Sequence, residues 1–227
     1  MRTYRWVAVL VLGCLLVCSA KAAEKIRVAC VGDSITFGYG LRNAAQESYP
    51  AALQKLLGSA YQVGNFGVNG AAVQRAAGKP YWTLPKMKDA EAFAPQIVVV
   101  MLGSNDANLK NWNAAAFAKD YGEFLAHWKA LPGKPTVYAA LPVPAYGQAF
   151  SIQPAVVEKE LPPLLKQAAE AAHVPVINTF EALSGKPELF PDKIHPNAQG
   201  AQLIADTVAK ALQAAAQAQD PLQGIDK

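Results

Sequence analysis

Cysteine, histidine and charge are all scarce in this sequence of 227 residues. It contains three cysteines and three histidines, and charged residues make up 17% of the chain. The histidines lie far apart in the sequence, and no histidine and cysteine residues have the spacing of a zinc site. No H-E-x-x-H motif is present. No glycine-rich phosphate or dinucleotide loop is present either. We therefore expect no metal and no other cofactor.

Long hydrophobic runs are also lacking, since the apolar segment at residues 6–17 is shorter than the roughly 20 residues that cross a bilayer. Two arginines precede this segment, and small residues follow it in the pattern Ala20-Lys21-Ala22. A basic start, a short apolar run and an A-x-A site predict a signal peptide at residues 1–23 and export to the periplasm or the medium. The alternative is a lipoprotein signal, which would leave a lipid anchor on Cys14.

Removal of the signal peptide changes both the charge and the cysteine count. The loss of Arg2, Arg5 and Lys21 lowers the formal net charge from +4 to about +1. This small charge gives no electrostatic basis for binding nucleic acid or a membrane surface, and we expect no stable membrane insertion. Cys30 then remains alone in an apolar segment, which predicts a buried thiol and no intrachain disulfide.

Short apolar segments alternate along the chain with longer segments rich in Ala, Leu, Lys, Gln and Glu. The run at residues 97–102 is apolar without alternation, as expected for a strand that is covered on both faces. The longer segments have the composition of helices. The predicted strands are residues 26–31, 61–66, 96–102, 135–141 and 174–178. The predicted helices are residues 49–57, 114–131, 156–172 and 198–215.

Strands separated by helix-length connections predict parallel pairing, because parallel strands need long crossovers. We expect an α/β fold, a three-layer α/β/α sandwich around a mainly parallel five-stranded sheet. No internal repeat and no Gly/Ser/Pro-rich linker divides the chain. The sequence therefore predicts one domain at residues 24–219, followed by a loose tail at residues 220–227.

Glycines and polar residues follow the predicted strands at their carboxyl ends, where open parallel sheets gather their working groups. The first strand is followed by Gly32-Asp33-Ser34, the second by Gly67 and the third by Gly103-Ser104-Asn105-Asp106. A fourth cluster, Asp192-Lys193-Ile194-His195, precedes the last predicted helix. These clusters predict a single site at one edge of the sheet.

Ser34 and His195 are the candidate reacting groups. A serine that opens a helix after a buried strand can be a nucleophile, and it can equally be a helix N-cap. Asp192 and His195 fall on the same side of a helical turn, so Asp192 can hold Nδ1–H and leave Nε2 as a general base. The alternative for this pair is a plain surface turn. His127 and His173 lie in or at the end of predicted helices and need no chemical role.

Gly67 and Asn105 are candidate donors to a developing oxyanion. A glycine lets its backbone N–H approach a substrate closely, and an asparagine offers a side-chain amide. Each residue also suits a turn, Gly67 through a positive φ and Asn105 through an Asx interaction.

Taken together, the four clusters resemble the four sequence blocks of the SGNH, or GDSL-type, serine hydrolases. The resemblance implies a catalytic triad of Ser34, His195 and Asp192. It also implies an oxyanion hole formed by the Ser34 N–H, the Gly67 N–H and the Asn105 amide.

The resemblance extends over about residues 25–212, nearly all of the mature chain. It implies a serine esterase with the flavodoxin-like three-layer fold of that family. The sequence departs from the GDSL motif at Ile35, where the family's nickname has Leu, a change common in its hydrolytic branch.

Two further segments, Pro80-Tyr81-Trp82 and residues 141–146, resemble the exported bacterial branch of the family that is similar to sialate O-acetylesterases. Aromatic residues beside a hydrolase site suit stacking on sugars, an acyl channel, or simple packing on the sheet. The candidate substrate contacts are Asp33, Tyr81, Trp82 and Ile194.

We therefore predict hydrolysis of small acyl esters, above all O-acetyl groups on carbohydrates, with a small-molecule or glycan ester as the partner. One alternative is a lysophospholipase, arylesterase or thioesterase of the same family that acts on longer acyl chains. Another is a non-catalytic carbohydrate-binding domain, which would have lost one of the triad residues, whereas Ser34, Asp192 and His195 are all present. The sequence indicates no particular oligomeric state.

Overall fold

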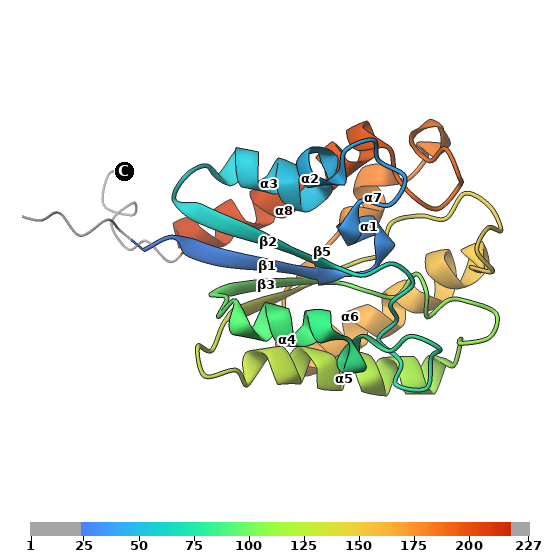
Figure 1. The fold of residues 1–227 in the computed structure, drawn as a ribbon. Coiled ribbons are helices and arrows are strands. Elements are labelled where there is room, and N and C mark those ends of the chain that lie inside the picture. Colours follow the sequence, from blue (N-terminus) through green and yellow to red (C-terminus); the bar gives the residue numbers. More distant parts are fainter. Residues whose placement is uncertain (1–23, 219–227) are drawn as a thin grey trace, which may run out of the picture.

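The computed structural model describes residues 24–218, which form one five-stranded sheet between two layers of helices (Figure 1). The strand order is β2-β1-β3-β4-β5, and all neighbouring strands are parallel. The predicted three-layer α/β/α sandwich is confirmed. The strands are β1 (Ile26–Gly32), β2 (Tyr61–Gly67), β3 (Ile97–Met101), β4 (Thr136–Ala140) and β5 (Val176–Ile177). The predicted signal peptide and C-terminal tail lie outside the described residues.

Two apolar cores, one on each face of the sheet, hold the layers together. In β1, Ala29 and Val31 point into one core, while Val28 and Cys30 point into the other. Successive side chains of a strand alternate between faces, so a strand buried on both sides needs an unbroken apolar run. Burial also raises the pKa of the Cys30 thiol to about 12, which keeps it protonated and unreactive.

The helices are divided between the two faces of the sheet (Figure 1). Helices α4, α5 and α6 cover one face, and α1, α2, α3, α7 and α8 lie over the other. The longer helices are α3 (Tyr49–Leu57), α4 (Pro85–Ala92), α5 (Ala114–Lys129), α6 (Leu161–Ala171) and α8 (Ala198–Ala218). The shorter helices are α1 (Ser34–Phe37), α2 (Ala44–Glu47) and α7 (Thr179–Leu183), with single turns at η1 (Tyr81–Thr83), η2 (Val156–Glu160) and η3 (Pro187–Leu189).

The pattern of buried residues in α6 explains why this segment is a helix. It buries Leu161, Leu165, Ala168 and Ala169, a spacing of four, three and one that lies on one face of a helix. Each fully buried leucine contributes about 2 kcal/mol of transfer free energy. The predicted helix at residues 156–172 begins with the single π-helical turn η2 and is α-helical only from Leu161.

The connections out of β1 and β3 open a crevice at the carboxyl edge of the sheet. The chain passes from β1 to β2 on one side and then to β3 on the other side of β1. Loops that leave β1 and β3 therefore diverge to opposite faces, and this is where open α/β sheets bind ligands.

Among residues 24–218, no helix is both long and apolar enough to cross a membrane.

Candidate active site

Ser34 stands at the first position of α1, immediately beyond the carboxyl end of β1. The Asp33 side chain caps this short helix by accepting a hydrogen bond of 2.9 Å from the Ile35 N–H. Ser34 therefore does not serve as the cap, and its hydroxyl remains available for another partner. The side chain lies at the floor of a cavity, with the residue 8% exposed.

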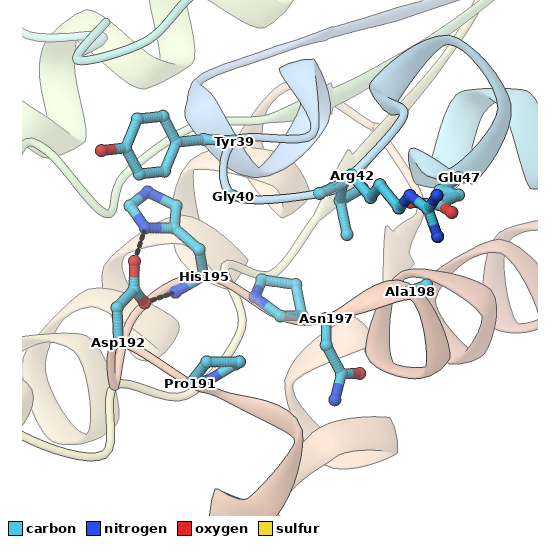
Figure 2. Close-up of a pocket in the computed structure, with 11 residues that line it drawn as sticks. Tyr39, Gly40, Arg42, Glu47, Pro191, Asp192, His195, Asn197 and Ala198 are labelled. Atoms are coloured by element: carbon cyan, nitrogen blue, oxygen red, sulfur yellow. Dashed lines mark hydrogen bonds and ion pairs between the residues drawn. The ribbon is translucent and has the colours of Figure 1, made fainter.

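His195 lies on the loop between η3 and α8, where Asp192 organises a tight turn (Figure 2). Asp192 Oδ1 accepts hydrogen bonds from the backbone N–H groups of Ile194, at 3.0 Å, and His195, at 2.7 Å. Lys193 within this turn has a φ of 74°, in the left-handed region. The turn thus places the His195 imidazole beside the Asp192 carboxylate, whose hydrogen bonds stabilise the turn.

The imidazole connects Asp192 to Ser34. His195 Nδ1 lies 2.6 Å from Asp192 Oδ2, and His195 Nε2 lies 2.8 Å from Ser34 Oγ. The serine and the histidine are separated by 161 positions in the chain, yet the sheet brings them into hydrogen-bond contact. With Nδ1–H donated to the carboxylate, Nε2 has its lone pair directed at the serine hydroxyl.

The charge on Asp192 is supported by its surroundings. Partial burial works to raise the pKa of Asp192, but hydrogen bonds from the His195 backbone, the His195 ring and the Ile194 N–H outweigh it. The pKa of Asp192 therefore lies below its ordinary value, and the carboxylate is ionised at neutral pH. Such an arrangement can extract a proton from Ser34 and stabilise the imidazolium that results.

Asn105 reaches the same cavity from the loop after β3. Its Nδ2 donates one hydrogen bond, of 3.0 Å, to the Ala71 carbonyl, which fixes the orientation of the amide. Asn111 Nδ2 donates to the Asn105 carbonyl at 2.9 Å and anchors the backbone of the loop. Because an amide nitrogen carries two hydrogens, Asn105 keeps a second donor for a ligand.

Gly67 does not occupy the position expected of an oxyanion donor. Its N–H already donates to Asn65 Oδ1 at 3.0 Å, and Gly67 does not line the cavity that holds Ser34. Gly70 lines that cavity instead, in a turn with a φ of 77°. Within residues 24–218, the Gly70 N–H donates no hydrogen bond to a backbone carbonyl. Of the two glycines, Gly70 and not the predicted Gly67 thus borders the cavity that holds Ser34.

The cavity around Ser34 has a volume of about 240 Å³. Two aromatic residues that the sequence does not single out border it, Tyr39 and Phe150. The centroids of their rings lie 4.5 and 5.1 Å from that of the His195 imidazole, and both side chains are partly exposed. The cavity is lined by Ser34, Tyr39, Asn69, Gly70, Asn105, Phe150, Ile152 and His195.

Phe150 is held at the cavity by a constrained loop. Both Phe150 and Ser151 have positive φ values, 53° and 60°, which are uncommon for residues with a side chain. Asn108 Nδ2 donates to the Phe150 carbonyl at 3.0 Å, and the Leu109 N–H donates to the Ser151 carbonyl at 3.0 Å. These bonds attach the loop to the segment after β3 and fix the aromatic ring beside the histidine.

The four predicted substrate contacts lie outside this cavity. Tyr81 is completely buried and donates its hydroxyl proton to the Phe66 carbonyl. Trp82 Nε1 donates to the Val73 carbonyl at 2.9 Å, and its ring is covered by the Arg75 guanidinium. Asp33 and Ile194 are buried beside the serine and the histidine respectively. The polar side-chain atoms of Tyr81 and Trp82 are thus used within the fold.

A pair of buried carboxyl groups lies beneath the site. Burial raises the pKa of Asp33 to about 7, although the Ile35 N–H donates to it, and the nearby Asp106 adds to the rise. Burial likewise raises the pKa of Asp106 to about 6, although hydrogen bonds from the backbone N–H groups of Gln74 and Val73 work to lower it.

In the part of the chain that the structure describes, no three His, Cys, Asp or Glu side chains cluster as metal ligands would.

The chain is similar to known acyl hydrolases. A curated acetylxylan esterase from Xylanibacter ruminicola is 32% identical over 212 residues, which cover 85% of this chain and 44% of that protein. The chain thus spans less than half the length of this relative. Thioesterase 1/protease 1/lysophospholipase L1 from Escherichia coli is 29% identical over 217 residues, covering 92% of this chain and 93% of that protein.

The fold is also found among solved structures. A carbohydrate acetylesterase from Sinorhizobium meliloti superposes with a TM-score of 0.72 at 21% identity, covering 84% of this chain and 100% of that one. The sequence model of the GDSL-like lipase/acylhydrolase family matches residues 30–203, a range that includes all four clusters of the site. The chain therefore belongs to the GDSL-like lipase/acylhydrolase family and is a carboxylic ester hydrolase.

Proposed function

We propose that this chain is an exported serine esterase that removes small acyl groups, above all acetyl groups, from carbohydrates. The observation that carries the proposal is the contact of Ser34 Oγ with His195 Nε2, at 2.8 Å, in line with the contact of His195 Nδ1 with Asp192 Oδ2, at 2.6 Å. A nucleophile, a base and an orienting carboxylate in hydrogen-bond contact are what acyl transfer requires.

In the first step, Ser34 Oγ attacks the carbonyl carbon of the ester while His195 Nε2 takes its proton. The carbonyl oxygen becomes an oxyanion that accepts hydrogen bonds from the N–H groups of Ser34 and Gly70 and from the Asn105 amide. The bond to the alcohol oxygen then breaks, and His195 returns the proton to that oxygen. This leaves the acyl group on Ser34 and a free alcohol.

In the second step, water attacks the acyl-enzyme. His195 removes a proton from the water, the oxyanion forms again in the same site, and the bond between the acyl carbon and Ser34 Oγ breaks. His195 gives its proton back to Ser34 as the carboxylic acid leaves. Asp192 stays ionised throughout and stabilises each imidazolium.

The small cavity supports a preference for short acyl groups. The cavity of about 240 Å³ around Ser34 is bordered by the apolar side chains of Phe150 and Ile152, which suit a short acyl group. The acetylesterase names of two relatives agree with a short acyl group, whereas the thioesterase and lysophospholipase name of the third suggests longer chains. Acyl length is therefore the property that the experiment must measure.

Export is supported by the first 23 residues, which have a basic start, a short apolar run and the pattern Ala20-Lys21-Ala22. An exported enzyme meets polysaccharide esters rather than cytoplasmic acyl-CoA, and this agrees with a glycan substrate. Fractionation of cells that express the full chain tests this part of the proposal. Retention of the uncleaved chain in the cytoplasm would contradict it.

The catalytic part of the proposal is tested by Ser34→Ala. We expect kcat for p-nitrophenyl acetate to fall by about 10⁵-fold or more, because the nucleophile is lost. Ser59→Ala is the matched control, since Ser59 is exposed and precedes β2 at the opposite end of the sheet. Substantial turnover by Ser34→Ala would remove Ser34 from the mechanism.

The substrate part is tested with p-nitrophenyl esters from acetyl to dodecanoyl, measured beside acetylated xylan. We expect kcat/KM to be highest for acetyl or butyryl esters and acetate to be released from the polysaccharide. A maximum at eight carbons or longer, without release of acetate, would favour the long-chain alternative.

A further inference from the structure

A second cavity shares two lining residues, Tyr39 and His195, with the first. It has a volume of about 400 Å³ and lies between the segments at residues 39–47 and 191–198. Figure 2 shows its lining, with the Tyr39 ring over the imidazole and with Arg42 and Glu47 at the far side. Tyr39 and His195 line both cavities, so the two are separate compartments of one site.

The lining of each cavity determines which part of an ester it can hold. Ser34, Gly70 and Asn105 all line the smaller cavity and do not line the larger one. The carbonyl group must lie in the smaller cavity, because its carbon bonds to Ser34 and its oxygen contacts the donors. The leaving oxygen receives its proton from His195 Nε2, so the alcohol lies beside the imidazole. A compartment that borders His195 but none of the oxyanion donors fits the alcohol.

The side chains of the larger cavity suit a sugar better than an alkyl alcohol. Tyr39 is 42% exposed and presents an aromatic surface. Arg42 offers several N–H donors, and Glu47 offers carboxylate acceptors. A sugar has apolar C–H faces and hydroxyl groups that both donate and accept, so it can use all three side chains at once.

Arg42 and Glu47 are also available for a ligand. Within residues 24–218, neither side chain forms an ion pair. Glu47 Oε2 accepts a hydrogen bond from the Asn43 N–H at 3.1 Å, and no described residue donates to its other oxygen. Because no ion pair uses either side chain, both can bind hydroxyl groups of a ligand.

We propose that this larger cavity is the subsite for the sugar ring that carries the acetyl group, with Tyr39 as the stacking surface and Arg42 and Glu47 as the partners of its hydroxyl groups. The proposal rests on the function proposed above and adds the residues that select the alcohol. Its substrate class is the acetylated neutral pyranose.

The test compares kcat/KM for acetylated xylo-oligosaccharides with kcat/KM for ethyl acetate, whose alcohol is too small to reach Arg42 or Glu47. We expect the ratio of the two to fall about tenfold or more in Arg42→Ala and in Glu47→Gln, because hydrogen bonds to charged groups contribute on that scale. Lys88→Ala is the matched control, since Lys88 is exposed on α4, which covers the other face of the sheet. The control should keep the wild-type ratio.

Tyr39 is tested with two substitutions. Tyr39→Ala should lower the same ratio about tenfold, and Tyr39→Phe should restore most of it, because phenylalanine keeps the stacking surface. Equal losses on both substrates in Tyr39→Ala would mean that Tyr39 only positions His195, and this would contradict its assigned role.

The outcomes separate this proposal from the function on which it rests. If the wild type cleaves both substrates but the Arg42, Glu47 and Tyr39 variants keep its ratio, the subsite is wrong and the esterase assignment stands. If the wild type cleaves ethyl acetate but no acetylated oligosaccharide, the carbohydrate substrate and the sugar subsite both fail. If it cleaves neither, the proposed esterase itself fails.

Discussion

Asp192 determines both the conformation of its own turn and the protonation of the histidine ring. One carboxylate oxygen accepts from two backbone N–H groups, and the other contacts His195 Nδ1. The first pair of bonds holds the carboxyl group in a fixed orientation, so the second oxygen has no freedom to turn away from the ring. A single side chain thereby defines where Nε2 lies and which tautomer the imidazole adopts.

Asp192→Asn should therefore lower kcat by making the wrong tautomer. The backbone N–H groups of Ile194 and His195 hold the asparagine carbonyl oxygen, which directs the amide NH₂ at Nδ1 and moves the ring proton to Nε2. We expect kcat to fall by about 10⁴-fold, against about 10⁶-fold for His195→Ala. Equal losses for the two variants, with circular dichroism unchanged, would contradict an orienting role.

Asn105→Ala should remove one of the three proposed oxyanion donors. We expect kcat for p-nitrophenyl acetate to fall 10²- to 10³-fold, or about 3 to 4 kcal/mol, with little change in KM, because this bond forms mainly in the transition state. The lost hydrogen bond to the Ala71 carbonyl should cost about 1 kcal/mol of stability, measurable by urea denaturation. A large rise in KM with unchanged kcat would assign Asn105 to ground-state binding.

Ser34 and Asn105 could be predicted from the sequence because parallel-sheet topology places the residues that follow β1 and β3 at one edge. His195 could be predicted from its spacing to Asp192, three positions earlier and just before the last helix. Gly70 could not be ranked above Gly67 in this way, since an N–H is presented by backbone conformation rather than by residue type. The dipeptide Asn69-Gly70 is the available signal, because such pairs mark turns with a positive φ. Tyr39 has no comparable signal, because its exposure depends on tertiary packing.

At the scale of elements, the crossing of β2 and α1 brings the first two loops of the site together. Gly67 ends β2 where α1 passes, and a Cβ there would lie 2.1 Å from the Phe37 backbone nitrogen. The absence of a side chain at Gly67 therefore allows the helix that carries Ser34 to lie against the strand. Gly67 has a structural role that accounts for its place in the sequence without any contact with substrate.

Gly67→Ala should destabilise this crossing by about 3 kcal/mol, because backbone atoms cannot move aside as a flexible side chain would. Gly78→Ala is the matched control, since nothing lies within 4 Å of its Cβ position, and we expect a change of less than about 1 kcal/mol. Urea denaturation of the two variants gives both values. Wild-type stability in Gly67→Ala would mean that the strand and helix do not pack so closely.

The elements that carry the fold are easier to predict than those that shape the site. Helix α3 is predicted at its observed bounds and α5 within two residues, because long amphipathic segments have a strong apolar period. Helices α1, α2 and α7 have four or five residues and are not predicted, since such short helices are stabilised by packing rather than by propensity. The loop with Phe150 depends on hydrogen bonds to a distant segment, which no local pattern contains.

At the scale of the whole molecule, the site lies above two buried acids that make stability depend on pH. The pKa of Asp33 is raised to about 7 and that of Asp106 to about 6, whereas an unfolded chain ionises aspartate near its model value of 3.8. The folded protein therefore holds more protons than the unfolded chain between about pH 4 and 7. The stability that these two groups contribute is complete below pH 4 and is lost as the pH rises through 6 and 7.

Asp33→Asn should flatten this dependence, because it removes one of the two titrating groups and the charge that raises the pKa of the other. We expect the free energy of unfolding of the wild type to fall relative to that of the variant by up to about 1.4 kcal/mol per pH unit between pH 4 and 7. Urea denaturation at several pH values across this window measures the difference in free energy of unfolding directly. The contributions of titrating groups elsewhere in the chain are the same in both proteins and cancel in this difference. Wild-type and variant curves that stay parallel would show that Asp33 is ionised throughout the window, held by the Ile35 N–H and not protonated by burial.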